Sequence, residues 1–237
     1  MIWLSVPLGT IQTVRESTWI IPLFPLDTVL FPHTALPLHI FEPRYREMVM
    51  YCLENDSPFG IVLVREGSRA GDPKAELHEV GTLARIGRLR RLPDGRFYLL
   101  ALGEERFQIV HLIRDEAPFL KAQVRLWRDA EPLSQEEERK FADQVAMEFR
   151  EFLSKVLDIS GLRVEDIELP RDPTALSFAI AGTLQLDIHA RQYLLELQDT
   201  TERLRIVQQI VRGLMESLTV EVVPFDPNRW REYLHRN

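Results

Sequence analysis

Residues 19–38 read Trp-Ile-Ile-Pro-Leu-Phe-Pro-Leu-Asp-Thr-Val-Leu-Phe-Pro-His-Thr-Ala-Leu-Pro-Leu, an apolar stretch in which proline recurs every three to seven residues. Because proline lacks a backbone N–H and fixes its own φ, this stretch cannot continue a helix. Proline is tolerated in extended segments at the edge of a sheet. The stretch therefore predicts short edge strands, or extended segments at the start of a β-barrel.

The chain that follows predicts one helix and then several strands. Pro43 suits a first helical turn, and apolar residues recur after it at helical spacing: Tyr45, Met48, Val49, Cys52 and Leu53. Strand-like apolar runs then occupy residues 59–64, 81–92, 96–103, 107–113 and 119–127. The turn Pro93-Asp94-Gly95 joins two of these runs as a hairpin. The total of about six or seven strands is enough to close a small barrel, with one helix embedded in it.

The remainder of the chain predicts helices. Ser134 and Glu137 form a capping box, and Asp172 and Asp187 have the position and side chain of further N-caps. The last helix, over residues 201–218, carries apolar residues at spacings of three and four. Four helices with apolar stripes predict a small four-helix bundle.

Charge and glycine divide the chain at the same place. Residues 1–127 carry 15 basic and 15 acidic residues, whereas residues 128–237 carry 14 and 21, and eight of the 11 glycines precede residue 104. A turn-rich part followed by a turn-poor part is typical of an α+β protein. We therefore predict four segments: an N-terminal extension (1–18), a β-barrel subdomain (19–127), a helical-bundle subdomain (128–218) and a C-terminal extension (219–237).

Composition excludes several classes of protein. A content of 45% hydrophobic and 27% charged residues is close to the globular average and excludes a disordered or fibrous chain. The single cysteine, Cys52, excludes an intramolecular disulfide and a cysteine-rich zinc site. The first 14 residues lack a basic leader, and no apolar run reaches the roughly 20 residues that span a bilayer. We expect a cytoplasmic protein without membrane contact.

The common catalytic constellations are absent from the sequence. It contains no phosphate-binding loop, no dinucleotide-binding glycine motif and no His-Glu-x-x-His zinc motif. The six histidines show no helical pairing that would direct two ligands at one metal. Cys52 lies on the apolar side of its predicted helix, where burial raises a thiol pKa and makes it unreactive. We predict no enzyme activity, no metal and no cofactor.

Five arginines crowd the predicted hairpin: Arg85, Arg88, Arg90, Arg91 and Arg96. Strand alternation places Arg88 and Arg90 on one face. Arg85 and Arg91 then lie on the other face, unless a bulge at Gly87 changes the alternation. The cluster either forms salt bridges with nearby acids or, through Arg88, Arg90 and Arg91, contacts the phosphates of RNA. The acidic pI near 5.5 favours the salt bridges and makes nucleic acid the less favoured partner.

Several motifs, taken in order along the chain, resemble the N-terminal, substrate-binding domain of Lon proteases. They are Ile21-Pro-Leu-Phe-Pro-Leu-Asp-Thr-Val-Leu-Phe-Pro32, Leu36-Pro-Leu38, Glu79-Val-Gly-Thr-Leu-Ala-Arg-Ile86, Leu92-Pro-Asp-Gly95, Gly103-Glu-Glu-Arg-Phe107 and Arg191-Gln-Tyr-Leu-Leu-Glu196. The segment His39-Ile-Phe-Glu-Pro-Arg-Tyr-Arg46 resembles the stand-alone branch of that family, which lacks the ATPase and peptidase domains.

The resemblance implies a PUA-like barrel (similar to pseudouridine synthases and archaeosine transglycosylases) followed by a helical bundle. It also implies a non-catalytic, ATP-independent module that binds polypeptide segments, or a partner protease or chaperone, in a proteolysis-related role. A homodimer stays an open alternative. The candidate polypeptide-binding residues flank the passage from loop to helix, where barrel and helix could form a cleft: Phe31, His33, His39, Phe41, Arg44 and Tyr45.

Overall fold

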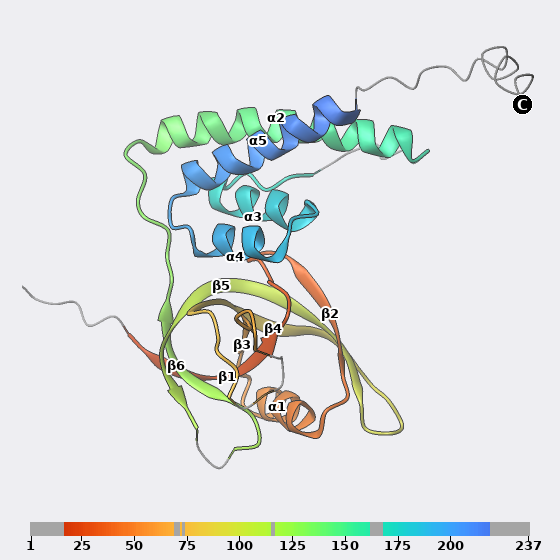
Figure 1. Cartoon of the computed structure of the whole chain (residues 1–237), viewed down its shortest axis with the longest axis vertical. Coiled ribbons are helices and arrows are strands. Elements are labelled where there is room, and N and C mark those ends of the chain that lie inside the picture. The colour runs from red at the N-terminus through yellow and green to blue at the C-terminus, as the bar shows by residue number, and fades with distance from the viewer. Residues whose placement is uncertain (1–16, 69–71, 73, 115–116, 162–167, 219–237) are drawn as a thin grey trace, which may run out of the picture. The chain divides into compact units, whose positions relative to one another are not determined.

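The computed structural model describes residues 17–68, 72, 74–114, 117–161 and 168–218 (Figure 1). The predicted C-terminal extension and all but the last two residues of the predicted N-terminal extension lie outside these ranges. The chain divides into two compact units, one ending at Arg128 and the other beginning at Asp129. In the described residues, no helix is both long and apolar enough to cross a bilayer.

The first unit contains one six-stranded sheet with the order β2-β5-β4-β3-β1-β6. Its strands are β1 (Trp19–Leu26), β2 (Ala35–Ile40), β3 (Phe59–Leu63), β4 (Val80–Arg91), β5 (Phe97–Ile113) and β6 (Lys121–Leu126). β1 and β3 are parallel, and the other neighbouring pairs are antiparallel. The 17-residue β5 pairs with β2 and β4 in its first part and with β6 in its last part, so the sheet curls strongly (Figure 1).

The α+β class and the helix embedded in the β-rich unit are confirmed, whereas the predicted closure of all strands into one barrel is not. β2 pairs with β5 alone among the described strands and remains an edge strand. Pro37 lies in β2 opposite Leu100. Since proline has no N–H to donate to β5, its nitrogen faces the open edge, which is where strand prolines are tolerated.

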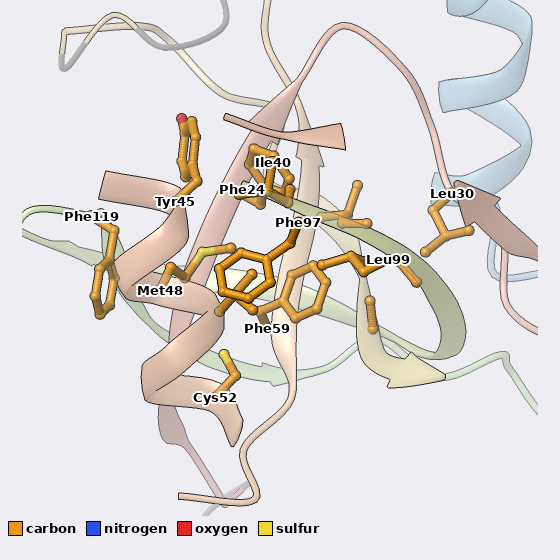
Figure 2. Packing of buried hydrophobic residues seen from close by; sticks show 14 residues of the cluster. Phe24, Leu30, Ile40, Tyr45, Met48, Cys52, Phe59, Phe97, Leu99 and Phe119 are labelled. Atoms are coloured by element: carbon orange, nitrogen blue, oxygen red, sulfur yellow. The ribbon is translucent and has the colours of Figure 1, made fainter. Parts of the chain in front are cut away.

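Helix α1 (Pro43–Glu54) forms one side of the core of this unit. Pro43 occupies its first turn as predicted, and Figure 2 shows Met48 and Cys52 on the side of α1 that faces Phe59 and Phe97. Burial raises the pKa of the Cys52 thiol to about 12, as expected for a core cysteine. Leu53, predicted on the same apolar stripe, is instead 44% exposed.

The second unit contains four helices: α2 (Gln135–Ile159), α3 (Pro173–Thr183), α4 (Ile188–Glu196) and α5 (Thr200–Leu218). The predicted N-caps are confirmed. Ser134 Oγ accepts a hydrogen bond from the Glu137 amide at 3.3 Å, and Asp172 and Asp187 accept equivalent bonds at the starts of α3 and α4. The long helices α2 and α5 lie side by side within the unit (Figure 1).

A buried arginine ties α5 to its surroundings. Arg203 is fully buried, and its guanidinium donates to the two carboxylate oxygens of Asp129 at 2.9 and 3.2 Å. The same group donates to Ser177 Oγ at 2.7 Å, Thr200 Oγ1 at 3.0 Å and the Leu197 carbonyl at 2.6 Å. It also lies 4.0 Å from the centre of the Phe178 ring. Every nitrogen of this buried cation therefore has a partner, as burial of a charge requires.

Candidate functional site

Two of the predicted polypeptide-binding residues belong to the core. Phe31 is fully buried, and Tyr45 packs its ring 4.3 Å from that of Phe24. Burial raises the pKa of the Tyr45 hydroxyl, and the neighbouring Arg44 partly opposes this effect. Phe31 is enclosed by its own core and cannot offer a ring face to another chain. Tyr45, by contrast, lines a pocket of about 260 Å³ together with Arg44.

His33 lies in a tight turn before β2 and has a left-handed backbone, with a φ of 61°. The turn is held by two hydrogen bonds, from the His33 amide to the Gly103 carbonyl and from the Gly103 amide to the Thr34 carbonyl, both 2.9 Å long. A Cβ at position 103 would collide with the Phe31 carbonyl, which explains the glycine. The His33 side chain is exposed, and the residue contributes to the fold through its backbone, which closes this turn.

Arg44 is engaged within its own turn. Its guanidinium donates to Glu42 Oε2 at 2.6 and 3.0 Å and lies 4.6 Å from the centre of the Tyr45 ring. The side chain is therefore already paired at the start of α1. His39 and Phe41 remain as predicted residues whose rings are exposed and lie beside other aromatic rings.

His39 and Phe41 form an exposed aromatic cluster with a residue that the sequence did not single out. The His39 ring stacks on Tyr98 of β5 with centroids 4.6 Å apart, and Phe41 lies 5.7 Å from His39. Phe41 is 59% exposed and Tyr98 50% exposed. We call His39, Phe41 and Tyr98 the outer aromatic face.

Tyr98 escaped prediction because β5 is apolar on both faces in this part. Phe97, Leu99 and Ala101 are buried, whereas Tyr98 and Leu102 are exposed although they are apolar or aromatic too. Alternation of apolar and polar residues, the usual signal for the outward side, is therefore missing. Only the register, which sets Tyr98 opposite His39, identifies the cluster.

The hairpin arginines divide into paired and unpaired groups. Arg85 donates to Glu104 at 2.7 Å and Arg96 to Asp94 at 2.7 Å, so the salt-bridge interpretation holds for these two. Hydrogen bonds from the Arg96 amide and side chain hold the pKa of the Asp94 carboxyl below its ordinary value. Within the described residues, Arg88, Arg90 and Arg91 have exposed side chains and no ion-pair partner.

A β-bulge redistributes these arginines between the two faces of the hairpin. The register shifts between Ile86 and Arg88, and the bulge contains Gly87. Arg85 therefore lies on the same face of the hairpin as Arg88 and Arg90, and Arg91 lies on the other face. Arg90 lies directly opposite Tyr98, next to the outer aromatic face, while Arg91 lies opposite the buried Phe97.

A pocket of about 480 Å³ lies between α1 and the hairpin, and we call it the α1 pocket. Apolar and aromatic side chains line it: Met50, Tyr51, Phe97 and Phe119. Pro43 and Gly95 also line it, and four charged residues complete the lining: Arg46, Glu47, Glu54 and Arg91. The pocket mixes apolar surface with both signs of charge, which is typical of ligand sites in proteins.

No cluster of three or more histidine, cysteine or carboxylate side chains that could hold a metal occurs in the described part of the chain. The two surfaces that stand out are therefore the outer aromatic face and the α1 pocket. Each combines apolar or aromatic surface with a nearby arginine, Arg90 beside the first and Arg46 and Arg91 in the second.

Comparisons with known proteins place this chain in a family. The sequence profile of the "ATP-dependent protease La (LON) substrate-binding domain" matches residues 20–213. "Lon protease 2" of Herpetosiphon aurantiacus is 32% identical over 213 residues, and "Lon protease 2" of Myxococcus xanthus is 26% identical over 200 residues. These alignments cover 85% and 84% of this chain but only 24% of each relative, so the chain spans about a quarter of the length of these relatives.

Solved structures share the fold. The Lon N-terminal domain protein from Xanthomonas campestris superposes with a TM-score of 0.59 and 23% identity, over 81% of this chain and 98% of that one. The N-terminal domain of the Mycobacterium avium complex Lon protease gives a TM-score of 0.59 and 21% identity, over 82% and 98%. At these identities the likeness concerns the fold alone.

Proposed function

Because the chain belongs to the Lon substrate-binding domain family, we propose that it recognises polypeptide segments for a partner protease or chaperone and catalyses no reaction itself. The observation that carries the proposal is the outer aromatic face. Its three rings come together on one exposed surface, and two of them are at least half exposed. Exposed aromatic clusters are typical of surfaces that bind other chains, since rings contribute large contact area with few rotatable bonds.

The finer assignment of the two units belongs to the same proposal. We assign residues 19–127 to a PUA-like subdomain and residues 128–218 to a helical-bundle subdomain. The curled six-stranded sheet with α1 supports the first assignment, and the contacts of α2, α3 and α5 with one another support the second.

The proposal is tested by titrating the protein with an unfolded polypeptide, for example reduced and carboxymethylated lactalbumin, and following binding by calorimetry. We expect saturable binding that weakens at least about tenfold when Phe41 and Tyr98 are both replaced by serine, because each ring contributes apolar contact area. Tyr193→Ser on α4 is the matched control, since Tyr193 is equally exposed but lies in the other unit. Absence of binding at tens of micromolar, or equal binding by the double variant, would refute the proposal.

RNA binding through Arg88, Arg90 and Arg91 is the weaker alternative. All three are exposed and unpaired among the described residues, which favours contact with an anion. However, Arg91 lies on the opposite face of the hairpin from Arg88 and Arg90, so the three cannot follow one phosphate backbone along a single face. RNA affinity that falls steeply with salt and is lost in the triple alanine variant would support this alternative.

A further inference from the structure

We infer that the α1 pocket binds the free C-terminal carboxylate of a polypeptide whose last residue is apolar. The inference rests on the proposed function and narrows it from polypeptide segments in general to chain ends. It concerns a different surface from the outer aromatic face, since the pocket uses α1 and the inner side of the hairpin.

The apolar part of the pocket fits one large side chain. Its volume of about 480 Å³ lies within the range of small-ligand sites. Phe97 and Phe119 are buried and fix the floor, whereas Met50 and Tyr51 are more than one-third exposed and border the opening. A leucine or phenylalanine side chain that enters would remove these exposed surfaces from water.

Two arginines supply the anion-binding part. Arg46 on α1 and Arg91 on β4 line the pocket, and neither guanidinium has a hydrogen bond or ion pair within the described residues. The Arg46 guanidinium lies directly against Gly95 at the hairpin turn, where a Cβ would collide with it. This contact holds the cation beside the hairpin, on the strand end that carries Arg91. The planar guanidinium of arginine can donate two parallel N–H hydrogen bonds to the two oxygens of a carboxylate.

The arrangement favours a chain end over an internal acidic residue. In a C-terminal residue the carboxylate and the side chain leave the same Cα, so one pocket can hold both. In an extended segment, an aspartate or glutamate directs its carboxylate to the face opposite the side chains of its two immediate neighbours, and the nearest side chain on its own face is two residues away.

The two glutamates of the pocket sharpen this preference. Glu47 and Glu54 form no ion pair with either arginine in the described structure, so their carboxylates remain available to accept N–H groups of the ligand. They also repel carboxylates, so an acid beyond the one that the two arginines bind would meet repulsion that no further cation among the described lining residues offsets. The pocket therefore selects one carboxylate accompanied by an apolar side chain.

The test compares two forms of one peptide, a fluorescein-labelled Gly-Ser decamer ending in Val-Ala-Leu, with either a free or an amidated C-terminus. We expect the free acid to bind at least about tenfold more tightly, as a charged hydrogen bond to arginine implies. In Arg46→Gln and in Arg91→Gln the free acid should bind no better than the amide. Arg88→Gln is the matched control, because Arg88 is equally unpaired but lies on the other face of the hairpin.

The outcomes separate the inference from the proposed function. Equal binding of acid and amide, or a preference that survives in both the Arg46 and Arg91 variants, overturns the inference and leaves polypeptide binding intact. Binding of unfolded lactalbumin without binding of either peptide also overturns it. Failure of the unfolded protein and both peptides to bind overturns the proposed function, and the inference falls with it.

Discussion

A buried arginine of the helical unit and four arginines of the β-rich unit have opposite surroundings. In the helical unit, Arg203 is fully buried and donates to Asp129, Ser177, Thr200 and the Leu197 carbonyl. In the β-rich unit, Arg46, Arg88, Arg90 and Arg91 have no ion-pair partner among the described residues. A buried cation must be fully paired, whereas an exposed one costs little when it is unpaired.

The contrast indicates what each arginine contributes. Arg203 holds α5 to the segment that precedes α2 and to α3, so its effect is on stability. Arg46 and Arg91 line the α1 pocket and Arg90 lies opposite Tyr98, so we expect these three to affect the proposed binding and not stability. The stability of the β-rich unit should then come from apolar packing, and four measurements test this division.

The largest effect is expected from Arg203→Met, which removes the charge and keeps most of the apolar stem. Asp129 then loses the arginine with which it forms a largely buried ion pair, and loss of one partner of such a pair costs about 3–5 kcal/mol. Urea unfolding followed by circular dichroism measures the change. Arg205→Met, at an exposed surface pair with Glu202, should leave stability unchanged. A similar small effect at both positions would remove the contrast between the units.

A smaller loss is expected from Met48→Ala on the buried side of α1. Met48 is fully buried, and truncation of a buried methionine to alanine costs about 2–5 kcal/mol. Met50→Ala two residues later should hardly affect unfolding, because Met50 is exposed, but it should weaken peptide binding at the α1 pocket. Arg46→Gln should likewise leave stability unchanged. A marked destabilisation by Arg46→Gln would show that an unpaired arginine is structural after all.

Gly95→Ala tests the contact between the hairpin turn and Arg46. Gly95 has a φ of 82°, and a left-handed backbone costs a residue with a Cβ about 1–2 kcal/mol. The new Cβ also displaces the Arg46 guanidinium, so the preference for a free carboxylate should fall. Urea unfolding and the paired peptides measure the two effects separately. Lower stability with unchanged carboxylate preference would mean that Gly95 serves only the turn.

The smallest effect is expected at an exposed pair that links α2 and α5. Hydrogen bonds from Arg212, and then from Gln144 and Gln208, hold the pKa of the Glu148 carboxyl below its ordinary value. A lowered folded-state pKa stabilises the protein above the ordinary value near 4.5, and this stabilisation is lost as the pH falls through the folded-state pKa. Glu148→Gln should lower Tm by about 1–3 °C at pH 7, with a smaller difference at pH 3. A difference independent of pH would contradict this account.

Local signals in the sequence predicted most elements of the fold. The prolines of residues 19–38 indicated strands, Pro43 indicated the start of α1, and Ser134 marked the start of α2; each interpretation depends on chemistry within a few residues. Such local signals could not predict that β2 pairs with β5 alone, because strand pairing depends on segments far apart in the chain. The same is true of the Arg203 network, whose members extend from Asp129 to Thr200.

The candidate site was predicted only in part for the same reason. Phe31 and Tyr45 lie in segments that resemble the family, and both are buried. The residues next to an aromatic side chain in the sequence do not show whether its ring lies in the core or on the surface. The bulge at Gly87 moved Arg85 to the other face, an outcome that alternation alone leaves open. Arg46 was not singled out because its contact with Gly95 exists only once α1 and the hairpin are folded together.

Pro37 has a consequence for the polypeptide binding that we propose. A protein that binds such chains beside an open strand risks becoming the seed on which they stack as further strands. With no N–H at its middle, β2 interrupts the row of donors that a docking strand would need. A polypeptide bound through side-chain contacts can dissociate, whereas one that adds to the sheet as a further strand through backbone hydrogen bonds dissociates far less readily. Under the proposed function, Pro37 would thus make contact at this edge compatible with release of the bound chain.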